Sequence, residues 1–199
     1  MVIVKTILDA PLESSGITLS SPWDDVIKKQ DSPEWKLKRV CCEIVNKFMF
    51  HTKVLKKDTQ RQLRENFTST YSPGLLMNCV QYLKMAVSNV YVSPKCVREC
   101  LMAIYYGIQN DSIFEKVHPH LESVLLDICI PLLGLNAKDQ EFWEEDQPQF
   151  VYAAVSMIDD HNIIKNASKI LIELLLGCAD PNDQLYVYSI VNFLVFYFK

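Results

Sequence analysis

The stretch PEWKLKRVCCEIVNKFM, residues 33–49, decides the fold class because its apolar side chains recur at helical spacing. The apolar positions follow i, i+3, i+4, i+7 spacing: they are Leu37, Val40, Cys41, Ile44, Val45, Phe48 and Met49. This spacing puts them on one face of an α-helix, which must then be buried against another element. Ser32-Pro33 marks the start, because a serine hydroxyl can cap free amides and proline suits the first helical position. We predict an amphipathic helix from about residue 33.

The same Ser-Pro start recurs at Ser72-Pro73 and Ser93-Pro94, and each pair precedes another apolar stripe. A further stripe follows Pro119, and Pro131 is expected to kink its last turn. Another stripe covers residues 163–178. The stripes after the second and third starts comprise Leu76, Cys79, Val80, Leu83 and Val87, and then Val97, Cys100, Leu101, Ile104, Tyr105 and Ile108. No segment has the period-two alternation of a strand bounded by turn glycines. We therefore predict an all-α fold.

The spacing of the helix starts favours a solenoid over a closed bundle. Taken in pairs, the starts give units of roughly 40 to 60 residues, compatible with the HEAT repeat of about 40 to 47 residues. Residues 1–199 are expected to form one segment of three to four HEAT-like antiparallel helix pairs, part of a longer solenoid. Within it, residues 2–8 are predicted to be a first helix and residues 9–31 an inter-helix loop.

The last apolar run, residues 185–198, leaves no polar stripe wide enough to face water. It is fourteen residues long and contains Ser189 and Asn192, whereas a span of the bilayer needs about 20 apolar residues. We expect a buried helix and no membrane insertion. If the chain is cut from a longer solenoid, one face of this helix is exposed, which predicts self-association through it.

Composition excludes several classes of function. The net charge of −4 and the absence of a block of five like charges argue against direct binding of nucleic acid. The five glycines lie too far apart for a GxGxxG, phosphate-loop or GxSxG motif. Seven dispersed cysteines without a C-x-x-C pair indicate a reducing compartment and buried, inert thiols. We expect no cofactor, no metal and no catalytic residue.

Residues 139–146 are the strongest candidate for a partner contact, because carboxylates surround two aromatic rings. The candidate residues are Asp139, Glu141, Phe142, Trp143, Glu144, Glu145 and Asp146. An EF-hand calcium loop would need a central glycine, which this stretch lacks. Two interpretations remain: a solvated acidic helix end anchored by the aromatic rings, or a contact surface for a basic partner. His118-Pro119-His120 is the only histidine cluster and has no third metal ligand nearby in the sequence.

Three segments together resemble the importin-beta superfamily of nuclear transport receptors, nearest to the importin seven and importin eight subgroup. The first is Ser32 to Arg39, which resembles the tryptophan-and-lysine opening of a repeat in that group. The second runs from Asp127 through Pro131 to Leu133 and on through the acidic-aromatic stretch to Val151. The third is Ala179-Asp180-Pro181-Asn182-Asp183. The resemblance covers roughly residues 22–198.

The resemblance implies a HEAT-repeat, armadillo-type fold and no enzyme activity. It also implies protein partners, namely cargo, the GTPase Ran and phenylalanine-glycine nucleoporins, and a location in the cytoplasm and nucleus at the nuclear pore. Two alternatives stay open. A HEAT-like scaffold unrelated to transport predicts the same helices without affinity for phenylalanine-glycine peptides, and a small all-helical enzyme predicts a closed bundle with a polar pocket.

Overall fold

The computed structural model describes residues 1–10, 21, 23–54, 62, 65–88, 90–133 and 137–155. Within these ranges the chain contains helices and no strand, so the all-α prediction is confirmed. The elements are α1 (Val2–Asp9), α2 (Trp23–Gln30), α3 (Pro33–Val54), the π-helical turn η1 (Phe67–Tyr71), α5 (Ser72–Val87), α6 (Pro94–Ile108), α7 (Asp111–Val117), the 3₁₀ turn η2 (His118–His120), α8 (Leu121–Val124), the π-helical turn η3 (Leu125–Cys129), α9 (Ile130–Leu133), α10 (Ala137–Glu145) and α11 (Gln147–Val155). The helices predicted over 163–178 and 185–198, and the motif at 179–183, lie outside the described residues.

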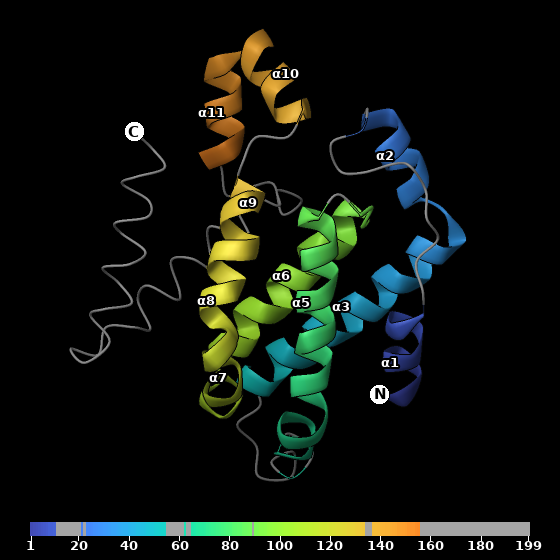
Figure 1. Ribbon diagram of the computed structural model, residues 1–199, viewed down its shortest axis with the longest axis vertical. Coiled ribbons are helices and arrows are strands. Elements are labelled where there is room, and N and C mark those ends of the chain that lie inside the picture. The colour runs from blue at the N-terminus through green and yellow to red at the C-terminus, as the bar shows by residue number, and fades with distance from the viewer. Residues whose placement is uncertain are drawn as a thin grey trace, which may run out of the picture.

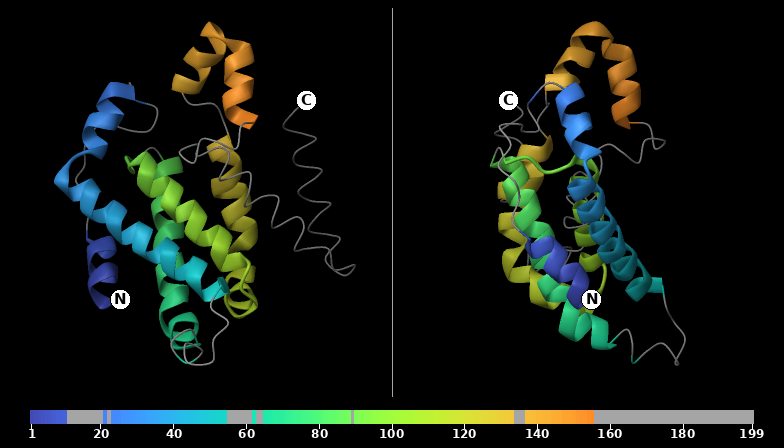
Figure 2. Two further views of the ribbon diagram at one scale, coloured as in Figure 1. Left: turned by 180° about the vertical axis from the view of Figure 1, so that it is seen from behind. Right: turned by 90° about the vertical axis from the view of Figure 1, so that its right-hand side faces the viewer.

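The larger helices form two layers (Figures 1 and 2). In one layer α3 and α6 lie side by side and run in the same direction, and they form the most extensive helix pair of the described chain. The other layer contains α1, α5 and the α8–α9 segment, which all run in the opposite direction. Because α5 is antiparallel to α6 and packs against both α6 and η3, adjacent helix pairs share one continuous core. This arrangement is an α-solenoid of helix pairs.

The core between the layers comes mostly from the predicted stripes of α5 and α6. Leu76, Cys79, Val80 and Leu83 of α5 are buried, as are Val97, Cys100, Leu101 and Ile104 of α6. Gly107 of α6 packs against α5, and a Cβ atom there would be 3.0 Å from Leu76 Cδ1. The stripes predicted for these two helices are therefore confirmed.

The buried face of α3 differs from the prediction. Leu37, Val40 and Phe48 are exposed, with Leu37 at 51% of its full surface, although helical spacing assigned them to the core. Cys41, Val45 and Met49 of the predicted stripe are buried, and α3 also buries Trp35, Lys38 and Cys42. The face is rotated because Trp35 packs edge-on against Tyr91 and Tyr82, with ring centroids 5.2 and 6.5 Å apart.

Lys38 is only 2% exposed, and its ammonium group reaches the end of α1. Its Nζ donates hydrogen bonds to the carbonyls of Ala10 (2.9 Å) and Ile7 (3.3 Å) and to the hydroxyl of Tyr82 (3.3 Å). Tyr82 in turn donates to the carbonyl of Leu8 at 2.9 Å. A cation beside the last carbonyls of a helix also complements the helix dipole. Lys38 therefore ties α1 to both α3 and α5.

The Ser-Pro pairs mark helix starts, but their hydroxyls do not form the predicted caps. Helix α6 begins at Pro94, and its second amide, on Lys95, donates to the side chain of Gln30 at 3.2 Å. Ser93 also donates to Gln30, at 3.4 Å. Ser72 lies inside its helix and bonds back to the carbonyl of Thr68 at 2.6 Å. At α6, the buried Gln30 of α2 thus replaces the expected local cap.

Helix α2 corrects the prediction of a loop over residues 9–31. Residues 23–30 of that stretch are helical, and Val26 is fully buried. Tyr91 Oη donates to the carbonyl of Val26 at 2.8 Å, which fixes α2 near the start of α6. The first helix, predicted for residues 2–8, is confirmed as α1.

Each of the two π-helical turns is followed, after one intervening residue, by a proline. Proline lacks the amide that would bond the carbonyl four residues earlier, and its ring displaces that carbonyl, so the preceding turn widens. Pro73 follows η1, and the carbonyl of Ser69 that it leaves without a helical amide accepts a hydrogen bond from Lys116 Nζ at 3.4 Å. Pro131 follows η3 in the same way. The predicted distortion at Pro131 takes the form of a π-turn.

Candidate partner-binding site

The acidic-aromatic stretch predicted as a partner contact forms most of α10, and α11 packs against it. Figure 1 places this helix pair at one end of the described chain, beyond α9. We call α10 and α11, residues 137–155, the acidic hairpin. The turn between its helices is tight, because Asp146 is the only residue that separates them.

The acidic hairpin is held together by three aromatic rings. Phe150 of α11 meets Trp143 edge-on at 5.6 Å and Phe142 at 5.8 Å between ring centroids. Asp146 caps α11, since its Oδ1 accepts a hydrogen bond from the amide of Gln149 at 3.0 Å. The expectation that two aromatic residues anchor this helix end therefore agrees with the contacts. Asp146 has a structural role as the cap.

The glutamates of α10 lie on the opposite side of the helix from the aromatic anchor. Glu141, Glu144 and Glu145 follow i, i+3, i+4 spacing, which places them on one face, and all three are exposed. Gln140 Nε2 donates to Glu144 Oε1 at 3.4 Å on this face. Trp143 is 38% exposed, so part of its ring is open to solvent on the same helix. Of Asp139 the structure fixes only its place in the first turn of α10.

This geometry suits the recognition of lysine and arginine side chains. Three carboxylates on one helical turn attract cations over about a Debye length, and an exposed indole edge provides apolar contact for their aliphatic stems. In the described part of the chain, no group of three or more His, Cys, Asp or Glu side chains is placed to hold a metal ion. None of the described helices is long and apolar enough to cross a membrane.

Comparison with known proteins gives a consistent set of relatives. Importin-8 of Danio rerio is 20% identical over 170 residues, which cover 81% of this chain and 17% of the relative. An importin beta-like SAD2 homolog of Arabidopsis thaliana is 23% identical over 195 residues, or 96% of this chain and 18% of the relative. Human importin-8 is 20% identical over 177 residues, or 86% and 16%. No protein-family model and no solved structure matches the chain.

The chain is similar over most of its length to members of the importin-beta superfamily. It spans about a sixth of the length of these importin relatives. The alignments cover most of the chain, and the two-layered helix pairs match the solenoid expected of the superfamily. Of the motifs that carried the resemblance, Trp35 and Lys38 are buried and structural, whereas the acidic stretch faces solvent.

The sequence-based prediction missed a second exposed surface of this chain. Leu37, Val40 and Phe48 form an apolar stripe along the side of α3 that faces away from α6, and Phe48 stacks on Phe67 with centroids 5.0 Å apart. The periodicity identified these residues as apolar but placed them inside. The prediction missed the true buried face of α3 because that face contains a lysine, Lys38, and apolar periodicity alone does not place a lysine in the core.

Proposed function

We propose that this chain acts as a segment of a nuclear transport receptor. In this proposal it binds protein cargo, the GTPase Ran and phenylalanine-glycine nucleoporins during import of proteins from the cytoplasm into the nucleus. The single observation that carries the proposal is the alignment with importins over 81% to 96% of the chain. The α-solenoid supports it, because receptors of this kind need extended binding surfaces and no catalytic site.

The stacking of helix pairs suggests how partners could compete. Each unit of a solenoid contacts only its neighbours, so small changes at successive interfaces add up to a change in curvature. A partner that prefers one curvature then weakens the binding of a partner that prefers another. Cargo release on binding of Ran would follow from this coupling.

We assign the acidic hairpin to cargo, with a lysine- and arginine-rich segment as the ligand. Glu141, Glu144 and Glu145 supply the negative charge, and the exposed edge of Trp143 supplies apolar contact. An exposed ion pair contributes only about 0.2–1 kcal/mol, so in this proposal the affinity comes from the combined effect of all three glutamates.

The hairpin assignment is tested by titrating the chain with a fluorescent lysine- and arginine-rich peptide and measuring anisotropy at two salt concentrations. The variant Glu141→Gln/Glu144→Gln/Glu145→Gln should bind roughly tenfold more weakly and lose most of the salt dependence. A matched control, Asp31→Asn/Glu65→Gln/Glu115→Gln, removes three other exposed acids and should change the affinity less than about twofold. Equal losses in both variants would show that only net charge matters.

The transport assignment is tested separately with phenylalanine-glycine peptides and with Ran in its GTP form. NMR titration should show weak binding of the peptides, micromolar or looser, because single phenylalanine rings bury little area and avidity supplies the rest. If neither ligand shifts any resonance at millimolar concentration, the chain is better described as a HEAT-like scaffold unrelated to transport.

A further inference from the structure

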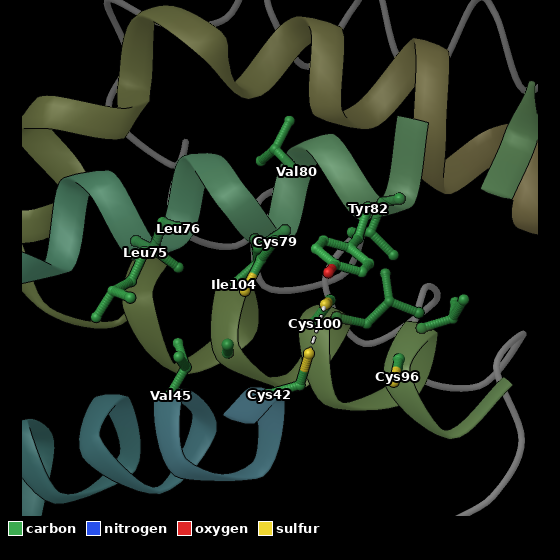
Figure 3. Close-up of a cluster of buried hydrophobic side chains, with 14 of the residues drawn as sticks. Cys42, Val45, Leu75, Leu76, Cys79, Val80, Tyr82, Cys96, Cys100 and Ile104 are labelled. Atoms are coloured by element: carbon green, nitrogen blue, oxygen red, sulfur yellow. Dashed lines mark hydrogen bonds between the residues drawn. The ribbon is translucent and has the colours of Figure 1, made fainter. Parts of the chain in front are cut away.

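Four cysteine side chains from three helices converge in the core (Figure 3). Cys42 comes from α3, Cys79 from α5, and Cys96 and Cys100 from successive turns of α6. All four are buried and present as free thiols. The sequence-based prediction of thiols among aliphatic neighbours is therefore incomplete, because these thiols are neighbours of one another.

Cys42 of α3 and Cys100 of α6 face each other across the interface between these two helices. The thiol of Cys100 donates to Cys42 Sγ at 3.8 Å, as the dashed line in Figure 3 marks. A disulfide needs the two sulfurs about 2.05 Å apart. Rotation of the two side chains and a small approach of the helices, shortening this distance by roughly 1.8 Å, would therefore join them.

The surroundings make Cys42 the more acidic member of the pair. Hydrogen bonds from Cys100 and then Cys96 lower its pKa against the opposing effect of burial, and the positive charge of Lys38 acts in the same direction. The pKa of Cys100 is raised, first because it donates to Cys42 and also because it is fully buried. A thiolate is the reactive form of cysteine, so Cys42 is given the role of nucleophile in the proposal that follows.

We propose that Cys42 and Cys100 form a disulfide bond when hydrogen peroxide oxidises the protein, and that this bond locks α3 against α6. The two helices are parallel neighbours in one layer of the solenoid, so the bond would stiffen the interface between adjacent helix pairs. Formation of the bond does not depend on the proposed transport function. Only its effect on partner binding rests on that function.

The oxidation proceeds in two balanced steps. The Cys42 thiolate attacks one oxygen of the peroxide, so that an S–O bond forms, the O–O bond breaks and the leaving hydroxide takes a proton to become water. Cys100 sulfur, losing its proton, then attacks Cys42 sulfur: the S–S bond forms, the S–O bond breaks and a second water leaves. Two thiols have lost two electrons and two protons, and the peroxide has been reduced to two waters.

Burial sets the rate of this reaction. Cys42 is 1% exposed and Cys100 is fully buried, so peroxide reaches them only when α3 and α6 open locally. The oxidation rate should therefore rise with low, non-denaturing concentrations of urea. In a reducing compartment such a bond is transient and marks an oxidising episode.

The test treats the reduced 199-residue chain with hydrogen peroxide, blocks the remaining thiols with iodoacetamide, and maps the peptides by mass spectrometry without reduction. The expected main product joins the peptides of Cys42 and Cys100, is lighter by two hydrogens than their sum, and disappears on treatment with dithiothreitol. Amide hydrogen exchange in α3 and α6 of the oxidised chain should be roughly tenfold slower or more, since the bond closes a long loop.

Cys129→Ser provides the matched control. This thiol is also buried, which raises its pKa to about 12, but it has no role in the pair, so the variant should still form the bond. Cys42→Ser and Cys100→Ser should abolish it. A main product that links Cys42 to Cys96 or Cys100 to Cys79, or sulfinic acid without any disulfide in the wild-type chain, would overturn the proposal without affecting the transport assignment. Peptide mapping of the wild-type chain tests the proposal even if a serine variant fails to fold.

Discussion

The core formed by α3, α5 and α6 and the acidic hairpin of α10 and α11 differ in what their side chains contact. In the core, Leu83, Leu101 and Ile104 are closed off from solvent between two layers of helices. In the hairpin two ring contacts between three aromatic side chains hold two short helices together, and the glutamates face water. The comparison separates stability from recognition: the core should determine whether the chain folds, and the hairpin should determine what it binds.

The largest expected effect comes from cutting a side chain out of the core. Leu101→Ala removes a fully buried side chain of α6 and should lower the free energy of unfolding by about 2–5 kcal/mol. Val151→Ala, at a 48% exposed position of α11, should change it by less than about 0.5 kcal/mol. Urea denaturation followed by circular dichroism measures both. Similar losses would mean that the hairpin belongs to the same cooperative core.

Lys38 offers a second test, of a polar contact inside the core. Lys38→Met keeps the aliphatic stem but removes the three hydrogen bonds to Ala10, Ile7 and Tyr82, and should cost about 1–3 kcal/mol. The control Lys36→Met changes an exposed lysine of the same helix and should be nearly neutral. Faster hydrogen exchange confined to α1 in the first variant would localise the effect. Equal stability of the two variants would contradict the clamp.

Alkaline pH should weaken the core through its buried tyrosines. Burial raises the pKa of Tyr82 and of Tyr91 above the usual value near 10, so both stay protonated in the folded chain while they ionise in the unfolded chain. Above pH 10 the unfolded state therefore binds fewer protons, and stability falls as pH rises, by about 1 kcal/mol per tyrosine at pH 11. Tyr82→Phe should reduce this slope in urea titrations between pH 9 and 11. An unchanged slope would count against the burial of this hydroxyl.

The smallest effect is expected where periodicity and structure disagree. Leu37→Gln should change stability by less than about 0.5 kcal/mol, because Leu37 is exposed on the free side of α3. Val45→Gln, on the buried side of the same helix, should be strongly destabilising because it buries an amide without partners. If Leu37→Gln proves as harmful as Val45→Gln, another element covers this stripe and the spacing argument is restored.

The sequence predicts those structural features whose cause lies in residues close to one another along the chain. The starts of α3 and α6 at their prolines, the stripes of α5 and α6, and the distorted turn before Pro131 were all predictable. Each depends on a residue's own backbone geometry or on neighbours within two turns of helix. The anchoring of residues 139–146 by aromatic rings was also within reach, since Phe150 lies close in sequence.

The sequence alone determined that the chain is helical, where several helices begin, and that it resembles the importin-beta superfamily. Only the tertiary structure decided which side of α3 is buried, because Trp35 and Lys38 find their partners in α5, beside α6 and at the end of α1. It also brought Cys42 and Cys100 together across 58 residues, and replaced the Ser93 cap by Gln30 across 63 residues. Periodicity reports how apolar a face is, whereas burial depends on which distant groups can satisfy the polar atoms on it, and that is settled only when the layers pack.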